Sequence, residues 1–194
     1  CKKIISVPVV LMTYGQFMET REVTNDFIGL KLIPNPIVDG IDRSTSQTIE
    51  ENRELLKEVV YKRIDPEVKL IDDEALDYAI DHSGGIIRQF IKILSHAGRR
   101  VRRLKGERIS INDVDHGAGS VRQEMEDSLI GTEKIALLEE VRTTHKPSTN
   151  DRDLLIECLL ANQILAFRNE PTWYSINPLI EKTVKIYAIK NKNE

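Results

Sequence analysis

The residues with the clearest chemical potential form a short run, HSGGIIR, at positions 82–88. Gly84 and Gly85 suit the left-handed backbone conformation that ends a helix, so the chain can turn sharply there. Arg88 then falls in the first turn of the next helix, where its guanidinium can donate charge-assisted hydrogen bonds to an anion such as phosphate. The spacing therefore indicates an anion-binding arginine. The plainer alternative is a surface arginine paired with an acid of the neighbouring helix.

The other reactive residue types do not assemble into a second site. The four histidines are His82, His96, His116 and His145. No two of them have metal-ligand spacing, and they form no Ser-His-Asp or Cys-His set. We expect His82 to bond carbonyls at its helix end and Cys158, on an apolar face, to be buried core. Arg43, in a polar linker, is either an arginine that acts on a neighbouring copy or, more simply, a linker residue.

A second concentration of charge is the basic run at residues 99–108. Its six members are Arg99, Arg100, Arg102, Arg103, Lys105 and Arg108. Such a run can contact a phosphate backbone. Acids are abundant in the flanking segments, residues 65–81 and 113–127, and oppositely charged helices that pack together neutralise each other. We therefore favour a solvated face with internal pairing over DNA contact.

Helices must position the glycine turn. From Asp72, a possible N-cap, residues 72–83 have the apolar periodicity of an amphipathic helix. The helix after the turn is predicted to bury Ile87, Phe90, Ile91, Leu94, Gly98 and Val101, with Arg88, Lys92, His96, Arg99 and Arg103 opposite. Residues 50–64 form an earlier helix. A later one begins at Ser110, with a capping box to Asp113, and is expected to break at Gly117 or Gly119. Residues 41–130 thus predict a small helical bundle.

The last 60 or so residues change character. Residues 133–144 predict a helix, and Asn150 or Asp151 begins another. A hairpin follows at residues 164–176, with Trp173 and Tyr174 as hairpin core, not a base-stacking platform. Residues 178–189 predict a closing helix. At the other end of the chain, residues 3–11 and 27–33 are strand candidates. Because two strands do not make a stable sheet, we interpret them as the remnant of an α/β domain and expect a longer protein.

Composition describes an ordinary globular protein of mainly α fold class. The 194 residues are 40% hydrophobic, 30% charged and 5% aromatic, with a net charge of −3. Nothing global indicates nucleic acid or an anionic membrane as a partner. We expect no signal peptide, and no apolar run reaches the roughly 20 residues that a bilayer span needs. We expect a cytoplasmic protein.

The Ser-Gly-Gly-x-x-Arg turn resembles the sensor-2 motif in the helical lid of AAA+ ATPases, including origin-recognition-type and STAND-like members. The order of elements is similar too: the end of a core, a lid, then a winged helix. The resemblance implies a core remnant at residues 1–40, a lid at 41–130 and a winged helix at 131–194. It implies that Arg88 reaches the phosphates of a nucleotide, with Gly84 and Gly85 shaping the turn. Many relatives carry aspartate at the position of Gly85.

The sequence holds no Walker-type phosphate loop and no apolar strand that ends in paired acids. The resemblance therefore implies that ATP and Mg²⁺ bind to a core outside this chain, and that the chain alone hydrolyses no ATP. Residues 133–194 hold nine acids and nine Lys and Arg. This neutrality predicts weak DNA binding or none, and a protein partner or self-association instead. Two alternatives stay open: a winged-helix DNA-binding regulator with a helical scaffold, and a pure protein-interaction domain.

Overall fold

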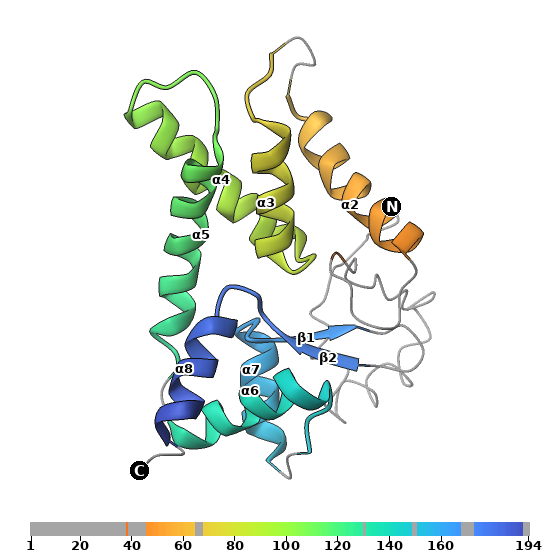
Figure 1. The fold of residues 1–194 in the computed structure, drawn as a ribbon, viewed down its shortest axis with the longest axis vertical. Helices are drawn as coiled ribbons and strands as arrows, with labels where there is room; N and C mark the ends of the chain where they lie inside the picture. Colours follow the sequence, from red (N-terminus) through yellow and green to blue (C-terminus); the bar gives the residue numbers. More distant parts are fainter. Residues whose placement is uncertain are drawn as a thin grey trace, which may run out of the picture.

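The computed structural model describes residue 38 and residues 46–64, 68–129, 131–148, 151–167 and 173–191. This part of the chain is mainly helical and has two antiparallel strands, as the sequence predicts (Figure 1). The two strand candidates near the N-terminus and Arg43 lie outside the described residues. No helix in the described ranges combines the length and apolar character that a bilayer span needs.

Four helices form a bundle in the first half. They are α2 (Ser46–Tyr61), α3 (Asp73–Ser83), α4 (Ile87–Arg103) and α5 (Ile111–Glu126). A single parallel bridge, Ile71 to Ile109, ties the entry of α3 to the loop between α4 and α5. Its two hydrogen bonds join Ile109 N–H to Leu70 O at 2.8 Å and Asp72 N–H to Ile109 O at 3.1 Å. Main-chain hydrogen bonds therefore hold the start of α3 to the α4–α5 loop, in addition to side-chain packing.

Ion pairs join α2 to α3. The Arg53 guanidinium donates to the carboxylates of Asp77, at 3.0 Å, and Asp81. It also donates to the Val38 carbonyl at 3.2 Å. Lys57 adds a second cation 3.2 Å from Asp77. A charge network thus joins the two helices in addition to their buried apolar side chains, and such a network stabilises more than an isolated surface pair does.

Helix α5 runs without a break through Gly117 and Gly119, so the expected interruption is wrong. Gly117 lies where α5 crosses α4: a Cβ there would sit 2.4 Å from Ile93 O and 3.1 Å from Ala97 N. The glycine permits a close backbone approach between two helices. It serves packing, not a bend.

The buried face of α4 also differs from the prediction. Phe90, Ile93, Ala97 and Val101 face the core, together with Gln89. Ile87 and Ile91, predicted inward, are 44% and 40% exposed. The reason is that the Gln89 side chain hydrogen-bonds to buried Asn177, which turns the Gln89 side of the helix inward.

The second half forms a C-terminal unit, defined here as α6 (Thr132–Thr144), α7 (Arg152–Leu160), the strands β1 (Ile164–Phe167) and β2 (Trp173–Ile176), and α8 (Glu181–Asn191). The strands pair antiparallel, with Ile164 opposite Ile176. Of the two predicted starts of α7, Asn150 and Asp151, the second is the N-cap: the Asp151 carboxylate accepts the Leu154 N–H at 3.0 Å. Trp173 is buried and stacks on Phe167, with ring centroids 4.1 Å apart, so its predicted place in the hairpin core is confirmed.

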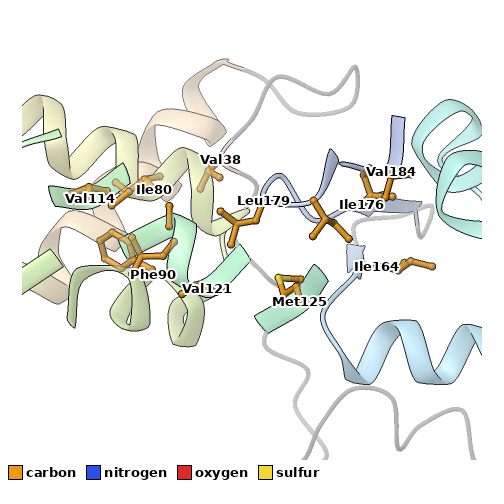
Figure 2. Close-up of a cluster of buried hydrophobic side chains, with 14 of the residues drawn as sticks. Val38, Ile80, Phe90, Val114, Val121, Met125, Ile164, Ile176, Leu179 and Val184 are labelled. Atoms are coloured by element: carbon orange, nitrogen blue, oxygen red, sulfur yellow. The ribbon is translucent and has the colours of Figure 1, made fainter. Parts of the chain in front are cut away.

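One apolar core runs through both halves. Figure 2 shows it continuing from Val114 and Phe90 of the bundle through Leu179 to Ile176 and Val184 of the C-terminal unit. Leu179 is 3% exposed and lies where the two halves meet. Core burial of this kind is the dominant favourable term in folding, so the halves are expected to fold together.

Candidate functional site at the Gly84–Gly85 turn

Two left-handed residues separate α3 from α4, as predicted. Gly84 has φ 57° and ψ 25°, and Gly85 has φ 80°. The buried Ser83 hydroxyl donates to Ile80 O at 2.7 Å and accepts the Gly85 N–H at 3.2 Å. The N–H groups of Gly84 and Ile86 bond to Asp81 O and Ser83 O, at 3.4 and 3.1 Å. The N–H groups of the turn are therefore already hydrogen-bonded within it, and its glycines serve to provide the left-handed backbone conformation.

Gly84 packs against the C-terminal unit. A Cβ on it would lie 2.7 Å from Cδ1 of Leu165 and 3.0 Å from Cδ of Pro178. Both the left-handed φ and this contact require glycine. The turn is consequently the place where the bundle meets the hairpin, a position that the sequence did not indicate.

A buried pair of amides completes the junction. Gln89 Nε2 donates to Asn177 Oδ1 at 3.1 Å, and Asn177 Nδ2 donates to Gln89 Oε1 at 2.8 Å. Gln89 also donates to His82 O at 3.0 Å, and Asn177 to Asn162 O at 2.9 Å. The Leu179 N–H donates to Asn177 Oδ1 at 3.0 Å. Gln89 and Asn177 are 7% and 0% exposed, so each depends on the other to satisfy its amide.

Arg88, one residue before Gln89, is exposed. No hydrogen bond or ion pair joins its guanidinium to the parts of the chain that the structure describes. The pairing with a neighbouring acid that we weighed as the alternative is absent from those parts. Neighbouring positions of one helical turn thus have opposite environments: Arg88 is open to solvent, and Gln89 is fixed to the C-terminal unit.

His82, beside the turn, has the expected structural role. Its Nδ1 lies 2.9 Å from Tyr78 O, and its ring packs on that of Tyr78 at a centroid distance of 4.1 Å. The Tyr78 hydroxyl donates to Asp115 of α5 at 3.0 Å. The imidazole thus packs against Tyr78, and it is the Tyr78 hydroxyl that reaches α5.

Other candidates for chemistry are structural or lie apart. Burial raises the pKa of the Cys158 thiol to about 11, which keeps it protonated and unreactive at neutral pH. The described residues contain no group of three or more His, Cys, Asp and Glu placed to hold a metal ion. An open hollow of about 510 Å³ along α2 is lined by Glu50, Glu51, Glu54, Leu55 and Glu58. Among the described residues, its lining comes from α2 alone.

Comparison of the chain with protein-family models, with curated proteins and with solved structures finds no match of any of the three kinds. The interpretation of the turn therefore depends on its residues and their geometry.

Proposed function

We propose that this chain is the nucleotide-sensing and partner-binding part of an AAA+-type P-loop ATPase whose nucleotide-binding core lies in residues outside it. One observation carries the proposal: exposed Arg88 and anchored Gln89 are consecutive residues at the start of α4. Arg88, which is available to bind an anion, is therefore next to Gln89, which is hydrogen-bonded to the C-terminal unit.

In this proposal the core supplies ATP and Mg²⁺ and the chemistry of phosphoryl transfer. The Arg88 guanidinium donates a charge-assisted hydrogen bond to a phosphate oxygen, which favours the conformation in which α4 lies close to the core. The Gln89–Asn177 pair and the Gly84 contact carry that movement to the C-terminal unit. Binding of nucleotide thus repositions the C-terminal unit for its partner.

We further propose that the C-terminal unit is a winged helix that binds a protein. The order helix, helix, hairpin, helix supports this assignment. The helix before the hairpin presents exposed Asp153 and Glu157 with a single exposed arginine, Arg152, and Glu157 also pairs with Lys134 of α6. A helix without net positive charge favours a protein partner over DNA.

The direct test is Arg88→Ala in a protein that joins this chain to its core. Losing one charge-assisted bond, about 1.5–3 kcal/mol, should weaken nucleotide binding or slow hydrolysis roughly 10- to 100-fold. Melting temperature should barely change, because exposed substitutions usually shift stability by about 0.5 kcal/mol. Phe90→Ala should instead cost about 3–5 kcal/mol of stability through a cavity in the core. Arg63→Ala, at an exposed arginine just after α2, is the matched control and should leave turnover unchanged.

Two results would contradict the proposal. One is a stability loss of several kcal/mol for Arg88→Ala with unchanged turnover per folded molecule, which would make Arg88 a structural residue. The other is a coding sequence with no Walker-type loop within about one domain length, roughly 100–250 residues, upstream of this chain.

A further inference from the structure

The end of α4 opposite the glycine turn carries a concentration of exposed positive charge. Its members are Arg99, Arg102 and Arg103 of the last helical turns, Lys105 and Arg108 of the following loop, and Lys69 across the Ile71–Ile109 bridge. We call this set the basic tip. In Figure 1 it lies at the α4–α5 loop, at the far end of the bundle from β1 and β2.

Internal pairing accounts for little of this charge, contrary to the expectation from the sequence. Within the described residues the Arg100 Nε bonds to Asp113 at 3.0 Å, and Arg108 lies 3.8 Å from Asp72. The structure shows no ion pair from Arg99, Arg102, Arg103 or Lys105 to any described residue. Glu107 is the only acid within residues 99–108. Within the described residues, Arg99, Arg102, Arg103 and Lys105 therefore keep unpaired positive charges at the tip, in a chain whose net charge is −3.

Helix stability does not explain the arrangement. Basic residues in a last turn interact favourably with the helix dipole, but this effect ends within that turn and does not extend to Lys105 and Arg108. Arg99 and Arg103, one turn apart on the same face, repel each other. Lys105 has φ 57°, a conformation that glycine adopts without strain and lysine does not. The repulsion between the arginines and the backbone strain at Lys105 both disfavour this arrangement, so the stability of α4 does not account for it.

We propose that the basic tip binds the phosphodiester backbone of a nucleic acid. Arginine predominates, and its planar guanidinium forms paired hydrogen bonds with phosphate oxygens, whereas lysine acts as a point charge. Arginines one helical turn apart, such as Arg99 and Arg103, can each contact a different phosphate along the backbone. A membrane surface fits less well, because residues 99–111 contain no aromatic side chain to insert. The exposed apolar side chains near the tip are aliphatic: Leu104 at 61%, Val68 at 46%, Leu70 at 41% and Ile111 at 38%. The inference is independent of the proposed function, since it uses neither Arg88 nor a nucleotide.

Fluorescence anisotropy of a short labelled DNA duplex of arbitrary sequence tests the proposal on the 194-residue chain. Contacts to four or five phosphates predict a dissociation constant of micromolar order near physiological salt. They also predict that log affinity falls with log salt with a slope of about −4. Arg102→Glu combined with Arg103→Glu should weaken binding at least about tenfold and make the slope shallower by about 2. Both residues are exposed, but glutamates at a helix C-terminus interact unfavourably with the helix dipole, so the melting temperature should fall slightly and binding is measured well below it.

Lys182→Glu combined with Lys185→Glu on α8 is the matched control, because it changes the net charge equally at another exposed site. This control should bind nearly as tightly as the unaltered chain. An equal loss in both double variants would show a general charge effect and overturn the assignment to the tip. Polyglutamate that competes as well as unlabelled duplex at equal charge would assign the tip to an acidic protein and overturn a nucleic acid as the ligand. Absence of measurable duplex binding at low salt would also overturn the proposal that the basic tip binds nucleic acid.

Discussion

Asp113 joins the start of α5 to the end of α4. Its carboxylate accepts hydrogen bonds from the Ser110 N–H at 3.1 Å and the Ser110 hydroxyl at 2.6 Å, and from Arg100 Nε at 3.0 Å. Burial raises the pKa of Asp113, but these hydrogen bonds lower it more, so the pKa lies below its ordinary value of 3.8. The predicted pairing of Ser110 with Asp113 is confirmed. Its extension to Arg100 uses a residue of the basic run and was not predicted.

This lowered pKa makes the stability of the protein depend on pH. A carboxyl group that is more acidic in the folded state stabilises the fold above its unfolded pKa, near 4, and loses that contribution as pH falls through the folded pKa. Asp113→Asn should therefore lower the free energy of unfolding by about 1–2 kcal/mol at neutral pH, and by less at pH 3. Urea unfolding at both pH values measures the difference. Asp127→Asn, an exposed control, should show no such loss, and a deficit of Asp113→Asn that does not shrink between neutral pH and pH 3 would contradict the assignment.

Among the helices, the close approach of α4 and α5 depends on a missing side chain. The clash of a Gly117 Cβ would be with backbone atoms of α4, which cannot move aside as a side chain can. Gly119, two residues on, differs: a Cβ there would have no heavy atom of the described chain within 4 Å. The two glycines of one helix therefore have opposite roles, which their shared sequence context does not reveal.

Alanine substitutions at the two glycines should have effects of opposite sign. Gly117→Ala has to separate the helices and should cost about 1–3 kcal/mol in the free energy of unfolding, despite the better helix propensity of alanine. Gly119→Ala should stabilise by about 0.4–1 kcal/mol, because it only reduces the freedom of the unfolded chain. Denaturant titration of both variants provides the measurement. Equal stabilisation by the two would mean that α4 and α5 are further apart than described.

The elements that local signals specify were predictable. The apolar periodicity and paired glycines place α3 to within a residue, and the two apolar runs around a turn place β1 and β2. The orientation of α4 was not predictable in this way. Ile87, Ile91 and Gln89 compete for the inward side, and the outcome depends on Asn177, 88 residues further along the chain. Periodicity identifies a helix, but a distant polar partner can decide which edge of its apolar face is buried.

For the whole molecule, α4 connects three proposed activities. Its first turn holds Arg88 and the junction residue Gln89, and its last turn belongs to the basic tip. If both proposals hold, a rigid helix with these ends would link nucleotide, C-terminal unit and nucleic acid mechanically. Such a linkage requires that the bundle and the C-terminal unit behave as one cooperative body, which the continuous core supports.

Denaturant unfolding tests whether the bundle and the C-terminal unit unfold as one cooperative body. Trp173, the only tryptophan, lies in the C-terminal unit, whereas far-ultraviolet circular dichroism reports on the helices of both halves. We expect the two signals to give coincident denaturant transitions, as two-state unfolding requires. Asn177→Ala leaves the Gln89 amide buried without its partner, so both transitions should move together by about 1–3 kcal/mol. Asn112→Ala, at an exposed asparagine of α5, should move neither. A Trp173 transition that precedes the loss of helicity would show that the C-terminal unit detaches first, and the mechanical link through Gln89 and Asn177 would then fail.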